Sequence, residues 1–164
     1  MSTYLNIQNK IFTQKEFSNK INTLKATNKK IVFTNGCFDL IHLGHIYYLS
    51  KASELADFLI IGLNSDNSVR KIKGKNRPIK DEKSRAMILA SFSFVNYVVL
   101  FDEKTPYDLI KIIKPNILVK GNDYKKEEIV GFDIVTKNKG EIITIDFLEG
   151  HSTTLLEKKC NIKY

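Results

Sequence analysis

Apolar residues along the chain gather into short runs, and longer amphipathic or polar stretches separate these runs. The run DFLIIGLNS shows no alternation between apolar and polar positions. This pattern is typical of a strand that is covered on both faces. We expect strands at 30–34, 57–65, 97–101, 116–120 and 141–147.

The stretches between these runs favour helices. The first places apolar residues three to five positions apart, which indicates an amphipathic helix. Asp81 is expected to cap a helix, and Thr105 followed by Pro106 is expected to begin another. The expected helices are 12–30, 45–56, 81–92, 105–114, 127–140 and 152–159, and the polar stretch 66–78 is assigned neither helix nor strand.

Strands that alternate with helices predict βαβ units and therefore an α/β fold with a parallel sheet of about five strands. We expect one domain over 1–164, with a helical extension at 1–28. Ligands of such sheets bind beyond the carboxyl ends of the strands. The candidate site segments are therefore 34–45, 64–77, 119–124 and 147–154.

Composition narrows the cellular setting and the partners. No apolar run approaches the roughly 20 residues that span a bilayer, and the N-terminus lacks the apolar region of a signal peptide, so we expect a cytoplasmic protein without a membrane partner. Cys37 and Cys160 form no CxxC and are expected to be reduced. The net charge of +8 can attract nucleic acid or anionic phosphates. Since no nucleic-acid-binding motif accompanies the charge, nucleic acid is not an expected partner.

The stretch FTNGCFDLIHLGH directly follows the first expected strand. Asn35 and Gly36 permit a tight turn, and Gly44 lets the backbone approach a ligand. His42 and His45 lie three residues apart, beside free N–H groups of a new helix that suit a phosphate. A capped turn with two half-exposed histidines is the alternative. No Cys or acidic residue has HExxH-like spacing, so no protein-held metal is expected.

Arginine is unevenly distributed, because Arg70, Arg77 and Arg85 all lie between the second expected strand and the next expected helix or its start. Arginine binds phosphate bidentately, so this basic segment could cover a triphosphate and a sugar phosphate. A solvated basic loop is the alternative. Asp39 and Asp66, at strand exits, could orient a hydroxyl, a basic residue or Mg²⁺, or could cap a turn.

Three segments together resemble the HxGH nucleotidyltransferases, a cytidylyltransferase-like superfamily: FTNGCFDLIHLGH, LVKGNDYKKEEIVG and EGHSTTLLEKK. The chain is most similar to bacterial D-glycero-β-D-manno-heptose 1-phosphate adenylyltransferases, including those fused to a sugar kinase, over roughly residues 12–160. The kinase half is missing here, so a stand-alone adenylyltransferase is expected. Cytidylyltransferase relatives carry an arginine where this chain has Phe147.

This resemblance implies a Rossmann-like, three-layer α/β/α fold and transfer of AMP from ATP to a sugar 1-phosphate, with Mg²⁺ bound mainly through the nucleotide phosphates. A cytidylyltransferase for glycerol phosphate or another alcohol phosphate is the alternative, and a non-catalytic nucleic-acid-binding domain is a more distant one. A homodimer is left open.

The resemblance also implies site residues. The expected catalytic residues are His42, His45 and Lys120. The expected nucleotide-binding residues are Thr34, Asn35, Gly36, Phe38, His42, Gly44, His45, Lys120, Gly121, Asp123, Ser152, Thr153 and Thr154. The expected substrate-binding residues are Asp39, Asp66, Lys73, Arg77 and Arg85.

Overall fold

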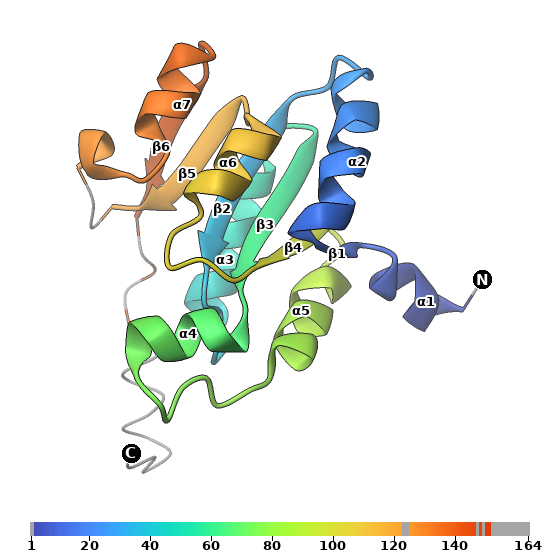
Figure 1. The fold of residues 1–164 in the computed structure, drawn as a ribbon, viewed down its shortest axis with the longest axis vertical. Coiled ribbons are helices and arrows are strands. Elements are labelled where there is room, and N and C mark those ends of the chain that lie inside the picture. The colour runs from blue at the N-terminus through green and yellow to red at the C-terminus, as the bar shows by residue number, and fades with distance from the viewer. Residues whose placement is uncertain (1, 123–124, 147, 149, 152–164) are drawn as a thin grey trace.

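Six parallel strands form one sheet in the order β1-β4-β3-β2-β5-β6 (Figure 1). The structure is a computed structural model that describes residues 2–122, 125–146, 148, 150 and 151. The strands are β1 (Ile11–Thr13), β2 (Ile31–Gly36), β3 (Phe58–Asn64), β4 (Tyr97–Phe101), β5 (Ile117–Gly121) and β6 (Glu141–Ile145). The expected α/β class and parallel sheet are confirmed, with one strand more than the sequence pattern indicated.

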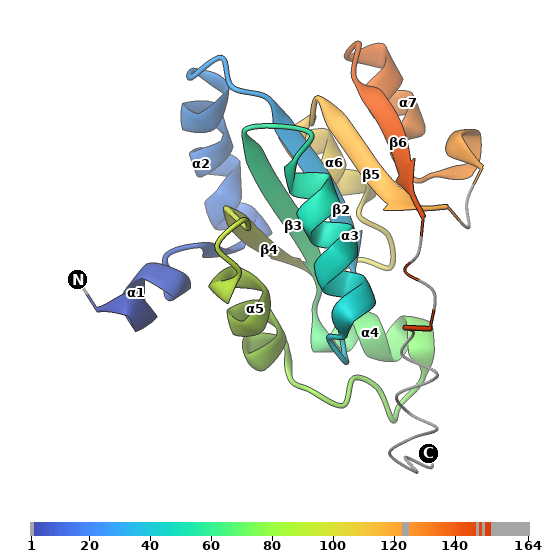
Figure 2. The ribbon, with the colours of Figure 1, turned by 180° about the vertical axis from the view of Figure 1, so that it is seen from behind.

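Helices cover both faces of the sheet. The helices are α1 (Thr3–Gln8), α2 (Gln14–Lys25), α3 (Leu43–Ser53), α4 (Asp66–Lys73), α5 (Glu82–Ser91), α6 (Tyr107–Ile113) and α7 (Phe132–Lys137), with a 3₁₀ turn η1 (Lys126–Glu128). Helices α2, α6 and α7 lie on one face, whereas α3 and α5 lie on the other (Figures 1 and 2). This is the expected Rossmann-like three-layer arrangement.

The packing explains why the strand sequences do not alternate. Successive side chains of a strand point to opposite faces of the sheet. Phe33 and Ile60 accordingly pack under α2 and α6, whereas Val32 and Ile61 pack under α3 and α5. Both directions are buried, so both must be apolar.

The N-terminal segment differs from the expected helical extension, because it contains β1 as well as α1 and α2. Three residues of an edge strand are too few to show a period, so the sequence pattern does not separate β1 from the helix that follows it. Thr13 caps α2 in a capping box: the Glu16 amide donates to Thr13 Oγ1 (3.3 Å), and the Glu16 carboxylate accepts from the Thr13 amide (2.8 Å).

Three other boundaries differ. The polar stretch after β3 contains α4, which Ser65 caps by accepting from the Ser68 amide. Pro106, rather than Thr105, is the N-cap of α6. The expected helix at 127–140 is divided into η1 and α7 by Gly131, whose φ of 92° is left-handed. The Asp81 cap is confirmed by its hydrogen bond from the Ser84 amide, while the expected helix 152–159 lies outside the described residues.

The chain leaves the neighbouring strands β2 and β5 in opposite directions along the sheet. From β2 the chain passes through α3 to β3, and then to β4 further along the same side. It later crosses from β4 through α6 to β5, on the other side of β2. The carboxyl ends of β2 and β5 therefore form the switch point at which sheets of this kind bind ligands.

Among the described residues, no helix has both the length and the apolar character required to cross a membrane.

We expect Phe17→Ala to destabilise the protein by about 3–5 kcal/mol, the cost of removing a large buried aromatic side chain. Phe17 is 0% exposed and contacts Phe12 and Tyr97 at ring-centroid distances of 5.5 Å. Urea unfolding gives the measurement, and Tyr4→Ala is the matched control because Tyr4 is 55% exposed. Equal, small effects of both variants would show that α2 is an appendage to the fold.

Candidate active site

The loop from β2 to α3 brings the two predicted histidines together. His42 is the N-cap of α3 and His45 lies in its first turn. Their ring centroids are 3.8 Å apart, and the His42 amide donates to His45 Nδ1 at 3.4 Å. A Cβ on Gly44 would lie 3.0 Å from the His42 ring and 3.1 Å from the His151 carbonyl oxygen. Only glycine fits this site without displacing either group.

The histidine pair is held in its neutral form. Burial, His42 and Lys73 lower the pKa of His45 to about 4. Burial and nearby His151 also lower the pKa of His42. Near pH 7 each neutral ring keeps one N–H donor. His42 Nδ1 is buried, and no hydrogen-bond partner is found for it among the described residues. Two imidazoles beside the N-terminus of α3 thus form a donor-rich environment that suits an anion.

Lys120 connects the two strands of the switch point. It lies near the end of β5, and its Nζ donates to the Asn35 carbonyl oxygen of β2 at 3.4 Å. The Asn35 side-chain oxygen is buried and has no hydrogen-bond partner in the described part of the chain. Gly121 ends β5 beside them and is buried. The expected residues of two distant sequence segments therefore meet at one edge of the sheet.

Two of the predicted nucleotide-binding residues are buried and support the site from beneath. The Thr34 and Tyr48 hydroxyls are hydrogen-bonded at 2.7 Å, which joins β2 to α3. Phe38 is 6% exposed and its ring packs edge-on against His45, with centroids 5.4 Å apart. Both side chains are buried against other residues of the protein, and neither faces solvent where a ligand could contact it.

Four predicted substrate-binding residues form two ion pairs. Arg77 Nη1 lies 2.6 Å from Asp39 Oδ2, and Arg85 Nη2 lies 2.7 Å from Asp66 Oδ1. Arg85 is fully buried and the Asp39 side chain is 2% exposed, so neither can reach a substrate in this conformation. The structure thus differs from the expected direct contacts, and it favours the alternative in which each aspartate orients a basic residue.

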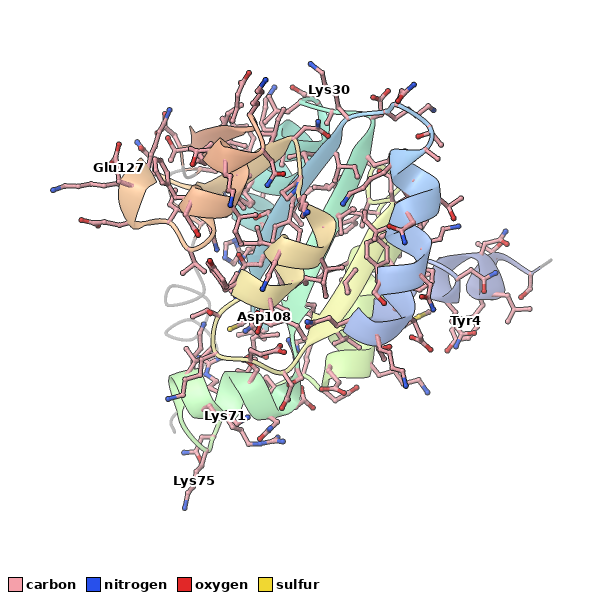
Figure 3. All side chains as sticks on the ribbon, turned by 45° about the horizontal axis from the view of Figure 1, so that its top comes forward. Tyr4, Lys30, Lys71, Lys75, Asp108 and Glu127 are labelled. Carbon is pink, nitrogen blue, oxygen red and sulfur yellow. The ribbon has the colours of Figure 1, made fainter. Side chains whose placement is uncertain are left out.

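Exposed basic residues remain on α4, which lies at the carboxyl edge of the sheet (Figure 1). Lys73 is exposed near the end of this helix, close enough to affect His45 electrostatically. Figure 3 shows Lys71 and Lys75 projecting from α4 and the turn after it. Asp123, Ser152, Thr153 and Thr154 lie outside the described residues, so their predicted roles stay predictions.

A separate open cleft of about 520 Å³ lies at the carboxyl ends of β1 and β4. Gln14 and Lys15 line one side, and Phe101 and Asp102 line the other. None of the residues expected from the sequence lines it. The Asp102 carboxylate already accepts from the Ser65 hydroxyl. The histidine loop therefore remains the candidate active site, since Asn35 Oδ1 and His42 Nδ1 are buried there without a hydrogen-bond partner among the described residues.

The chain is similar in sequence to cytidylyltransferase-like proteins. A family model described as cytidylyltransferase-like matches residues 33–159. The bifunctional protein HldE of a Nitratiruptor species is 57% identical over 136 residues, which cover 83% of this chain and 29% of that protein. HldE of Campylobacter jejuni subsp. doylei is 52% identical over 161 residues, which cover 94% and 34%. The chain thus spans about a third of the length of these relatives.

Two solved structures are similar. A lipopolysaccharide core biosynthesis protein from Thermoplasma volcanium has a TM-score of 0.61 and 27% identity, covering 75% of this chain and 99% of that one. A pantoate-beta-alanine ligase from Francisella tularensis, complexed with beta-gamma ATP and beta-alanine, has a TM-score of 0.62 and 20% identity, covering 93% and 77%. The second likeness supports the fold alone.

The lowered pKa of His45 makes stability depend on pH. Between the unfolded pKa of ~6.5 and the folded pKa of about 4, the unfolded chain binds more protons, so stability falls as the pH falls through this window. We expect His45 to account for a loss of up to about 3 kcal/mol between pH 7 and pH 4. His45→Gln should remove this part of the slope. Unfolding free energies at several pH values measure it, and parallel curves for the two proteins would contradict the burial of a neutral His45.

Proposed function

The chain belongs to the cytidylyltransferase-like family, and from this premise we propose that it transfers AMP from ATP to a heptose 1-phosphate, giving ADP-heptose and pyrophosphate. Two observations support the proposal: His42 and His45 lie together at the N-terminus of α3, and Lys120 of β5 contacts the Asn35 carbonyl oxygen of β2 at the switch point of the sheet.

An oxygen of the sugar phosphate would attack the α-phosphorus of ATP, and pyrophosphate would leave. The attacking phosphate is already anionic near neutral pH, so the reaction requires no general base. Catalysis then consists of positioning and of stabilising the charge that develops. His42, His45 and Lys120 would donate to the α-phosphate and the leaving group, while Ser152, Thr153 and Thr154 would bind the β- and γ-phosphates.

Mg²⁺ is proposed to enter on the nucleotide. Among the described residues, no group of three His, Cys, Asp or Glu side chains could hold a metal ion. We propose that phosphate oxygens of the nucleotide supply most of the ligands. Bound there, the ion would neutralise charge on these oxygens. We propose a cytoplasmic location for this reaction, as expected from the sequence.

The choice of ATP and heptose 1-phosphate rests on the sequence resemblance. The KGNDY stretch is similar to that of heptose 1-phosphate adenylyltransferases, and Phe147 stands where cytidylyltransferases carry an arginine. The similarity to HldE over 83–94% of this chain supports the same choice. Lys73, which is exposed near the histidine pair, is the best placed described residue to attract the sugar phosphate.

We expect kcat/KM for ATP to exceed that for CTP by at least ~10-fold with heptose 1-phosphate, and glycerol 3-phosphate to be inert. A phenyl ring can pack against a purine but offers cytosine no hydrogen-bond donor. Pyrophosphate release measures each pair of substrates at fixed Mg²⁺. Faster release from CTP with glycerol 3-phosphate would reject the adenylyltransferase and leave the family membership intact. Salt-sensitive binding to oligonucleotides without any pyrophosphate release would favour the nucleic-acid-binding alternative.

His45→Ala should lower kcat by about 10²-fold, the usual effect of removing one donor to the transition state. The unfolding midpoint should change little at pH 8, where His45 is neutral in the folded and unfolded chain. Single-turnover pyrophosphate release measures the chemical step. An unaltered kcat would remove His45 from the catalytic residues.

A further inference from the structure

Arg85 forms hydrogen bonds to three segments of the chain near the carboxyl ends of β2 and β3. Its Nη1 donates to the carbonyl oxygens of Cys37 (2.6 Å) and Asn64 (2.9 Å), which follow β2 and end β3. Its Nε donates to the Lys80 carbonyl oxygen (3.0 Å), and its Nη2 pairs with Asp66 (2.7 Å). Lysine has one nitrogen in place of this rigid fork and cannot reach all of these acceptors at once.

Asp39 makes a second attachment from the same loop. Its carboxylate accepts from Arg77 Nη1 (2.6 Å), from the Ile79 amide (2.8 and 3.0 Å) and from the Lys80 amide (3.0 Å). Burial acts to raise the pKa of Asp39, but the hydrogen bonds to its charged form and the Arg77 charge together outweigh burial and lower the pKa. The carboxylate is therefore fully occupied by the chain itself.

Phe38 lies between these two attachments. Its φ of 44° is left-handed, which is a strained conformation for a bulky residue. Its neighbours Cys37 and Asp39 are the residues that Arg85 and the 77–80 segment hold. The Phe38 ring contacts His45 edge-on, and its carbons lie 3.0–3.4 Å from the position of a Cβ on Gly36. The attachments thus maintain a strained residue whose ring supports a predicted catalytic histidine.

We propose that Arg85 and Asp39 are positioning residues, which fix the loop between β2 and α3 so that Phe38 holds His45 against His42. Neither residue contacts substrate. The effect of these residues on the rate of turnover rests on the proposed nucleotidyl transfer. Their effect on the position of the His45 ring does not depend on that function.

The test compares Arg85→Lys and Asp39→Asn with the parent chain by NMR titration of the histidine rings. The chain has three histidines, so the signals can be assigned with single His→Gln variants. In the parent, His45 should titrate at about 4, set by burial and by nearby His42 and Lys73. In both variants we expect a rise of at least about one pH unit toward the ordinary ~6.5, because a displaced ring becomes solvated. Arg85→Lys leaves the net charge unchanged. Asp39→Asn removes a negative charge, which by itself would lower the pKa of His45. A higher pKa of His45 in either variant therefore indicates that the His45 ring has moved.

Activity gives the second readout. We expect kcat for pyrophosphate release to fall on the order of 10- to 100-fold in both variants, as expected for misplaced reacting groups, while KM for ATP changes less than about 3-fold. Asp81→Ala is the control for a loss of stability alone. Asp81 caps α5, the helix that carries Arg85, and its carboxylate accepts from the amide and the hydroxyl of Ser84 in the same helix. It should lower the unfolding midpoint without moving the His45 titration.

The proposal is overturned if folded Asp39→Asn or folded Arg85→Lys keeps the parent titration of His45, or if Asp81→Ala shifts it equally. Should Arg85→Lys fail to fold, Asp39→Asn decides alone. If the parent chain releases no pyrophosphate from any pair of substrates, the proposed function fails, while a displaced His45 in the variants still supports the positioning role.

Discussion

The burial of both faces of a parallel sheet determines where this protein can act. Helices α2, α6 and α7 cover one face, and α3 and α5 cover the other. A ligand can therefore bind at the ends of the strands, where the helices do not cover the sheet. At the carboxyl edge the chain departs from β2 and β5 in opposite directions, and side chains from distant segments meet there. For this reason Lys120 of β5 reaches the Asn35 carbonyl oxygen of β2, in the segment that leads to the His42–His45 pair.

The same burial determines the charge state of the site. An imidazole packed against Phe38 and a second imidazole loses part of its hydration, so the protonated form is disfavoured. The pair is therefore neutral near pH 7, and the positive character of the site comes from the start of α3, from Lys120 and from Lys73. A polyphosphate that arrives beside the rings would favour their protonated form, which couples binding of the anion to uptake of protons.

Much of the fold, and the proximity of His42 and His45 in the candidate site, could be predicted from the sequence. The five expected strands and the His42–His45 turn depend on local pattern, on glycine and on apolar runs, which one sequence shows directly. Strand β1 was missed because three residues show no period, and α4 was missed because its residues are polar and its cap, Ser65, lay at the end of an apolar run. The buried ion pairs could not be predicted, since Asp39 and Arg77 are 38 residues apart and only the fold shows that they meet.

The arginines illustrate why a residue type does not by itself determine a role. From the sequence, a fork of N–H donors suggested bidentate binding of phosphate. In the structure, the fork of Arg85 is used for two strand ends, a linker and one carboxylate, because carbonyl oxygens and carboxylates present the same acceptors as phosphate. A fixed phosphate site requires donors with fixed positions, and these positions depend on the loop between β2 and α3. The rigid, always charged guanidinium is suited to hold that loop, whereas exposed lysines such as Lys73 can follow a substrate as it enters and leaves.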